Sequence, residues 1–163
     1  MKKRVLLIFL LSLFMMGLGA APYVGISQGL VSTTVELGYL TRSVDQNLAL
    51  SFPTIPALET SDGDFYQYPT LSLNVNFKHM FFEQVSLAAG PTLRMGWEYK
   101  EALLLKMGLS VQLSLEAPGV MDILFVEYSY LPSGLTLMEG SPTSSMLEEG
   151  AEQFLRFGWR HAF

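Results

Sequence analysis

The chain has 163 residues, 10 Lys and Arg against 15 Asp and Glu, a formal net charge of −5 at pH 7, and no cysteine. This acidic balance argues against a nucleic-acid-binding protein, which needs clustered Lys and Arg. The lack of cysteine excludes a disulfide framework, so packing and hydrogen bonds must hold the fold.

The N-terminal segment predicts a cleaved secretory signal peptide over 1–21. Three basic residues at 2–4 precede an apolar run over 5–18, and three small residues follow at 19–21. This order is typical of an export signal, and the run is shorter than the ~20 residues of a transmembrane helix. Cleavage after either of the last two alanines fits equally well. We therefore expect a single mature domain over 22–163.

The mature chain predicts eight β-strands, because apolar residues recur at every second position. The alternation is strongest from Val85 to Tyr99 and from Leu103 to Leu115. These two runs are more than twice the usual strand length of about five or six residues. The predicted strands are 22–30, 33–42, 46–54, 67–82, 85–99, 102–116, 121–131 and 152–163.

The connections indicate the direction in which the strands cross a membrane. If both termini lie in the periplasm, the long connections at 55–66 and 132–151 both lie outside, and every periplasmic turn is short. Transmembrane barrels have this asymmetry of loops and turns. The sequence therefore predicts an all-β fold, a transmembrane antiparallel up-and-down barrel of eight strands.

The polar faces of the predicted strands collect charges of both signs together with glycines. An eight-stranded barrel has a bore just wide enough for side chains to fill. Glycines on this face would leave room for long side chains to cross the bore and pair. We predict an internal ion-pair network that closes the lumen or leaves room for a few waters or ions. Its members are Glu36, Lys78, Arg94, Glu98, Lys106, Glu116, Glu127, Arg156 and Arg160.

Aromatic residues concentrate near the predicted strand ends. Tyr and Trp favour the boundary between membrane and water, where an apolar ring can carry a polar edge. We expect one girdle at the outer rim and another at the periplasmic rim. The outer girdle comprises Tyr66, Tyr68, Trp97, Tyr99, Tyr128 and Tyr130, and the periplasmic girdle comprises Tyr39, Phe81, Trp159 and Phe163.

The C-terminal strand carries Leu155, Phe157, Trp159 and terminal Phe163 on one face. This pattern resembles the C-terminal signature of bacterial outer-membrane β-barrels, which the insertion machinery reads. Over 22–163 the chain resembles the small eight-stranded barrels of the OmpX type and the membrane domain of OmpA. The resemblance implies a Gram-negative outer-membrane location, reached through the secretion and barrel-insertion machinery. It also implies contact with lipid and lipopolysaccharide, a monomer, and no cofactor.

Residues that could support catalysis or metal binding are few. His79 and His161 both fall on the predicted lipid-facing side, and no serine accompanies them there. Asp62 and Asp64, with Glu59, form only a fragment of a calcium loop. We expect no catalytic, cofactor or metal site, and hence no enzyme.

Four functional classes remain open on the sequence. The first is a structural or surface-interaction role through the acidic extracellular loops, because loops on a rigid scaffold often carry recognition. The second is a small pore that conducts ions or solutes. The third is a lipid-modifying outer-membrane enzyme. The fourth is a periplasmic lipocalin-like binder, whose apolar interior would leave the aromatic girdles unexplained.

Overall fold

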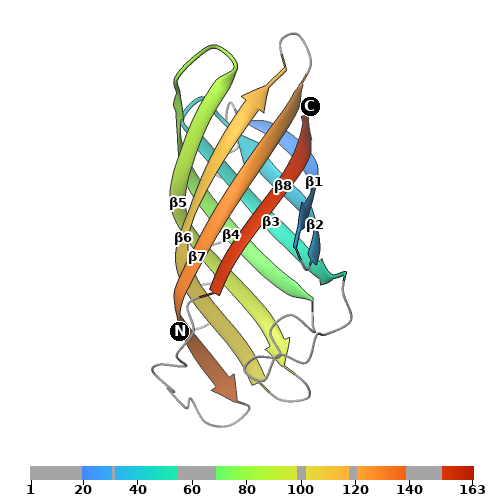
Figure 1. Cartoon of the computed structure of the whole chain (residues 1–163), viewed down its shortest axis with the longest axis vertical. Coiled ribbons are helices and arrows are strands. Elements are labelled where there is room, and N and C mark those ends of the chain that lie inside the picture. Colours follow the sequence, from blue (N-terminus) through green and yellow to red (C-terminus); the bar gives the residue numbers. More distant parts are fainter. Residues whose placement is uncertain (1–19, 31, 55–68, 99–101, 118–120, 139–151) are drawn as a thin grey trace.

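The computed structural model is a closed barrel of eight antiparallel strands, and it describes residues 20–30, 32–54, 69–98, 102–117, 121–138 and 152–163. The strands are β1 (Ala21–Gly29), β2 (Ser32–Leu40), β3 (Val44–Pro53), β4 (Thr70–Met80), β5 (Val85–Glu98), β6 (Ala102–Glu116), β7 (Asp122–Met138) and β8 (Glu152–Ala162). Each strand pairs with the next, and β8 pairs with β1 to close the ring (Figure 1). The predicted all-β, eight-stranded fold is confirmed. Within the described part of the chain, no helix has the length and hydropathy needed to cross a membrane.

The two ends of the barrel differ in their connections. At one end, which we call the turn end, β1 begins and β8 finishes, and residues 41–43 and 81–84 form short turns. At the opposite end, the loop end, the strands are joined across 54–69 and 139–151. The turn end is uppermost in Figure 1. Both long connections therefore leave the barrel on the same side.

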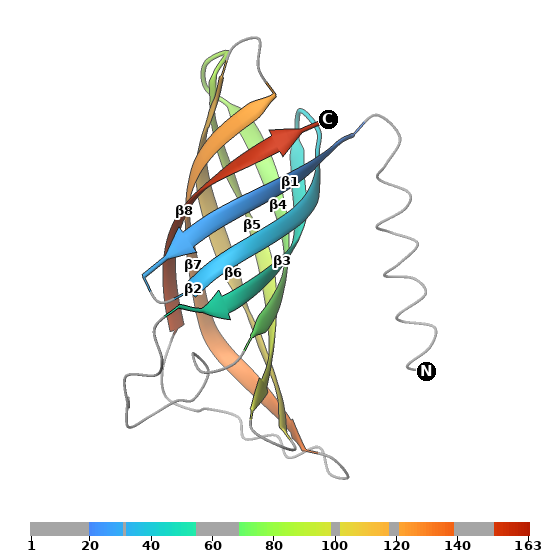
Figure 2. The ribbon, with the colours of Figure 1, turned by 90° about the vertical axis from the view of Figure 1, so that its right-hand side faces the viewer.

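Strand length varies around the ring. β1 and β2 have 9 residues each, whereas β6 has 15 and β7 has 17. The longer strands extend past the shorter ones at the loop end (Figure 2). Pairing between β6 and β7 reaches the Ala102–Met138 pair, while pairing between β7 and β8 stops at Leu131 and Glu152.

Several predicted strand boundaries are wrong. The second strand ends at Leu40 rather than 42, and the fourth covers Thr70–Met80 rather than 67–82. We expected the seventh strand to end at residue 131, and the next residue, Pro132, cannot donate to a sheet ladder. Instead β7 continues to Met138, and a register shift opposite Met107 and Leu109 takes the proline out of regular pairing. The third strand begins at Val44, two residues earlier than expected.

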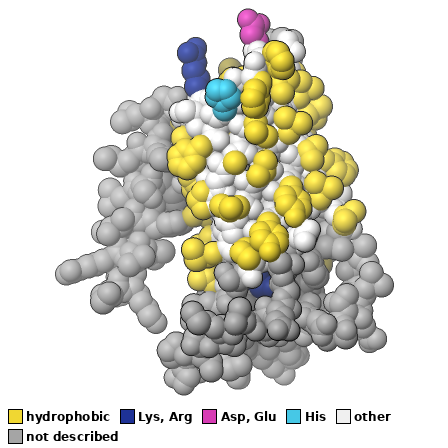
Figure 3. Space-filling view, turned by 60° about the vertical axis from the view of Figure 1, so that its left-hand side comes forward, with side chains coloured by type: hydrophobic (Ala, Val, Ile, Leu, Met, Phe, Trp, Pro, Cys, Tyr) yellow, Lys and Arg dark blue, Asp and Glu magenta, His cyan; other side chains and the backbone are white. Residues whose placement is uncertain are grey.

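Side chains alternate between the two faces of the barrel wall, except at the start of β3, where Asp45, Gln46 and Asn47 are all buried. In β6, Leu109, Val111 and Leu113 are exposed, whereas Ser110 and Gln112 between them are buried. Other strands repeat this pattern, so the outer surface is apolar and the interior is polar. In Figure 3, hydrophobic side chains spread over the flank of the barrel, and the coloured charged side chains lie toward its ends. This arrangement is the inverse of a water-soluble core.

Candidate functional site

Arg160 is the centre of the polar interior. It lies on β8, and its side chain is 1% exposed. Its Nε donates to Glu36 Oε2 at 2.8 Å, and its Nη1 donates to Asp45 Oδ2 at 2.6 Å. Its Nη2 makes a further ion-pair contact with the same Glu36 oxygen at 2.7 Å. One guanidinium thus joins carboxylates from β2 and β3 across the lumen.

Arg156 extends the network on the same face of β8, four residues before Arg160. Its Nε and Nη2 donate to Glu127 Oε1 at 3.1 and 2.9 Å, and Nη2 also donates to Oε2 at 2.8 Å. Its Nη1 lies 2.8 Å from Glu36 Oε1. Glu36 therefore bridges the two arginines. We call Glu36, Asp45, Glu127, Arg156 and Arg160 the arginine cluster.

Asp45 belongs to this cluster although sequence reasoning missed it. Tyr23 donates its hydroxyl to Asp45 Oδ1 at 2.7 Å, and Gln112 Nε2 donates to Oδ2 at 3.0 Å. The predicted turn at 43–45 had placed this residue outside a strand. Asp45 shares the parity of Asn47 and Ser51, whereas Val44, Leu48 and Leu50 have the opposite parity, and this was the signal that could have found it.

Aromatic rings and glycines position the Arg160 guanidinium. Its central carbon lies 4.0 Å from the centre of the Phe125 ring and 4.8 Å from that of Tyr23, within the range of cation–π attraction. The space for these groups comes from two glycines on neighbouring strands. A Cβ at Gly25 would lie 2.8 Å from Arg160 Cγ, and one at Gly38 would lie 2.4 Å from Tyr23 Cζ. The glycines therefore let the long side chains lie flat across the bore.

A ladder of neutral side chains fills the lumen wall beside the cluster. Asn74 Nδ2 donates to Asn47 Oδ1 at 2.9 Å, and the Thr92 hydroxyl donates to Asn74 Oδ1 at 2.5 Å. Ser110 donates its hydroxyl to Asn76 Oδ1 at 2.7 Å. All five side chains are buried. The interior is thus occupied by mutually bonded polar groups across several strands.

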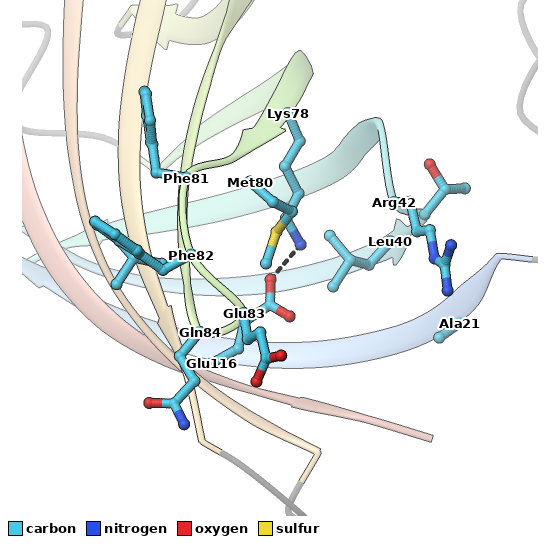
Figure 4. Close-up of a pocket in the computed structure, with 12 residues that line it drawn as sticks. Ala21, Leu40, Arg42, Lys78, Met80, Phe81, Phe82, Glu83, Gln84 and Glu116 are labelled. Carbon is cyan, nitrogen blue, oxygen red and sulfur yellow. Dashed lines mark hydrogen bonds and ion pairs between the residues drawn. The ribbon is translucent and has the colours of Figure 1, made fainter.

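A second ion pair lies nearer the turn end. Lys78 on β4 pairs with Glu116 on β6, and both point into a cavity of about 1150 Å³ that opens at this end (Figure 4). Leu40 and Met80 supply apolar lining, and Arg42 lies at the rim. No described residue that lines the cavity belongs to the arginine cluster. The structure therefore separates the predicted network into a central group and this outer pair.

The remaining predicted lumen charges lie apart from both groups. Arg94 donates through Nε to the Ser72 hydroxyl at 3.2 Å, and its guanidinium lies 3.6 Å from the centre of the Phe154 ring. Lys106 is buried on the inward face of β6. The side chain of Glu98 lies outside the described residues.

The predicted girdle residues occupy the outer face where the structure describes them. At the turn end, Tyr39 is exposed on β2, and Phe81 and Phe163 are exposed just beyond the ends of β4 and β8. Tyr128 and Tyr130 are exposed near the middle of β7, opposite the loop-end part of the shorter β8. Residues Tyr66, Tyr68 and Tyr99 and the side chain of Trp97 lie outside the described residues.

The C-terminal pattern occupies the strand that closes the barrel. Leu155, Phe157 and Trp159 are all exposed on the outer face of β8. Phe163 follows the strand, and its backbone N–H donates to the Pro22 carbonyl at 2.9 Å. β8 pairs with β1 on one side and β7 on the other. The strand that carries these outward apolar residues therefore joins the first and last parts of the wall.

Comparison with known proteins supports the fold alone. No family model and no curated protein sequence matches the chain significantly. The chain is similar in structure to TMB2.3, a de novo designed transmembrane β-barrel whose structure was solved by solution NMR. It is 12% identical in sequence, with a TM-score of 0.54, and the match covers 91% of this chain and 98% of that one. The chain thus has the architecture of an eight-stranded barrel, and no comparison connects it to the OmpX or OmpA family.

Proposed function

We propose that this protein is an integral outer-membrane barrel with a structural or surface-interaction role and a lumen that is closed to ions and solutes. The turn end faces the periplasm, and the loop end faces the outside. The role is not catalytic. The single observation that carries the proposal is the arginine cluster, which crosses the bore of a barrel whose outer face is apolar.

The outer face supports a membrane location. Large apolar side chains such as Ile26, Leu37, Leu109 and Phe157 are exposed on separate strands around the wall. A soluble protein rarely exposes a continuous apolar surface of this extent. Closed barrels are one of the two structures whose backbone groups can all be paired inside hydrocarbon. The signal peptide predicted over 1–21 supplies the route of export.

The interior supports a closed lumen rather than a pore. Conducting barrels keep a continuous aqueous path, whereas eight-stranded barrels are commonly filled by side chains. Here Arg160 and Glu127 are 1% exposed, and Glu36 is fully buried. These five side chains occupy the bore; each carboxylate contacts an arginine, and the cluster as a whole carries one net negative charge. The network serves to stabilise the wall.

The surface role rests on the acidic composition of the two long connections. Residues 55–66 include Glu59, Asp62 and Asp64, and residues 139–151 include Glu139, Glu148 and Glu149. Acidic groups at the outer surface of an outer membrane would bind divalent cations that bridge to lipopolysaccharide phosphates, or a basic partner. Both segments connect strands whose described ends lie at the loop end.

Two measurements test this function. Membrane fractionation with unheated and boiled gel samples should place the protein in the outer membrane and show a heat-dependent mobility change. In planar bilayers the purified protein should give no conductance steps above the lipid baseline. Steps that are altered by Arg94→Ala or Glu127→Ala would instead establish the pore. Recovery in the soluble periplasmic fraction would contradict the membrane assignment.

A further inference from the structure

Both histidines of the chain lie on the outer face near the turn end, and each packs against a phenylalanine two positions later. The ring centres of His79 and Phe81 are 5.1 Å apart at 84°, and those of His161 and Phe163 are also 5.1 Å apart at 84°. The two sites differ in one respect. His161 Nδ1 lies 2.8 Å from Asp122 Oδ1, whereas His79 has no ion-pair partner among the described residues.

Asp122 is unusual on this surface. It begins β7 and pairs across the strands with His161, and their side chains are 34% and 39% exposed. Among the described strand residues it is the one acidic side chain on the outward face. A carboxylate is costly in hydrocarbon, and an ionisable group on a membrane face marks a functional site by default. Because the pair lies at the end of the wall, beyond the apolar Leu124, the proposed membrane orientation would put it at the level of lipid head groups.

The hydrogen-bonding capacity of the pair defines the ligand. Because the carboxylate can only accept, Nδ1 of His161 donates to it, and in the tautomer with the hydrogen on Nδ1 the second ring nitrogen, Nε2, is an acceptor. The second oxygen of Asp122 is also an acceptor. Trp159 stacks on the imidazole with ring centres 6.1 Å apart at 29°, so an indole face borders the same site. Two acceptors, one negative charge and an aromatic face favour a cation that carries N–H donors.

We propose that Asp122, His161 and Trp159 bind the primary ammonium of a phosphatidylethanolamine head group in the membrane leaflet at the turn end. This inference rests on the proposed function, because it requires the outer face to contact lipid. A choline head group carries a positive charge but has no N–H to donate to the two acceptors. A phosphatidylglycerol head group has no cation and would be repelled by the carboxylate. Phe163 packs against the imidazole and fixes its orientation.

The test uses the protein isolated from outer membranes and exchanged into mixed micelles. Phosphatidylethanolamine, phosphatidylcholine and phosphatidylglycerol with identical acyl chains are added in equal amounts, and native mass spectrometry measures the lipid retained. We expect about tenfold stronger retention of phosphatidylethanolamine, as one charge-assisted hydrogen bond provides. Asp122→Asn and His161→Phe should abolish the preference. Asp122→Glu should restore most of it, and His79→Phe is the matched control that should leave it unchanged.

The outcomes separate this inference from the proposed function. Heat-dependent gel mobility shows whether each variant is folded. If Asp122→Asn does not fold, the proposal is tested by the order in which the wild-type protein retains the three lipids and by the loss of the preference in His161→Phe. Equal retention of the three lipids by a heat-modifiable outer-membrane protein would overturn the ammonium site while the barrel assignment stands. An unchanged preference in a folded Asp122→Asn variant would overturn it as well. If the protein is absent from the membrane fraction, both proposals fail.

Discussion

The arginine cluster predicts a large and specific loss of stability when Arg160 is replaced by methionine. Methionine approximates the length of the side chain but cannot pair with the carboxylates. Glu36 would keep its 2.8 Å contact with Arg156, whereas Asp45 would keep only the neutral donors Tyr23 and Gln112. The change therefore leaves one buried carboxylate without a cation. Removing one partner of a buried pair costs about 3–5 kcal/mol.

A double-mutant cycle separates this charge effect from loss of packing. Asp45→Asn in the Arg160→Met background removes the uncompensated carboxylate, so we expect it to recover about 1.5–3 kcal/mol, the value of a hydrogen bond to a charged group. Arg42→Met is the matched control, because Arg42 is exposed at the turn end and should change stability by about 0.5 kcal/mol or less. The assay is urea unfolding in lipid vesicles, followed by tryptophan fluorescence. A loss below about 1 kcal/mol for Arg160→Met, or no recovery on adding Asp45→Asn, would refute the reasoning.

Two further predictions use the same unfolding assay. Tyr23→Phe removes the 2.7 Å hydrogen bond to the Asp45 carboxylate and should lower the free energy of unfolding by about 1.5–3 kcal/mol. Tyr39→Phe on the outer face is the control and should lower it by about 0.5 kcal/mol or less. Equal losses would contradict the role of the buried hydroxyl. Gly108→Ala places a Cβ 1.9 Å from a backbone carbonyl oxygen of β7, while the nearest atom to a Cβ at Gly29 is 3.4 Å away. We expect Gly108→Ala to lower the free energy of unfolding by about 1–3 kcal/mol and Gly29→Ala to change it by less than about 1 kcal/mol. If Gly108→Ala has no effect, β7 can move aside and the close approach is not essential.

The alternating sequence was sufficient to predict the barrel because its two faces have opposite chemistry. In β6, apolar Val111 and Leu113 flank polar Gln112, so the strand and the direction in which each side chain points follow from period two. The structure places Arg156 and Arg160 on the inward face by the same parity. Where a strand ends cannot be read in this way. β7 passes Pro132 because a register shift in its pairing with β6 accommodates the missing donor.

The pairing within the lumen depended on geometry that the sequence does not contain. Parity assigns a side chain to the interior, but the partner is set by strand tilt and by the depth at which each strand begins. Lys78 pairs with Glu116 rather than with a member of the arginine cluster because both lie near the turn end. Asp45 was missed because two residues at the start of β3 were assigned to a turn.

The central claim is that apolar side chains face lipid and the charged set faces the barrel axis. The chain has no cysteine, so single cysteines can be introduced without background and spin-labelled at successive positions from 109 to 113 of β6. The rate of collision between the spin label and apolar oxygen in vesicles should alternate along the segment. It should be high at positions 109, 111 and 113 and low at positions 110 and 112. The opposite alternation, or uniform access along the segment, would contradict the account.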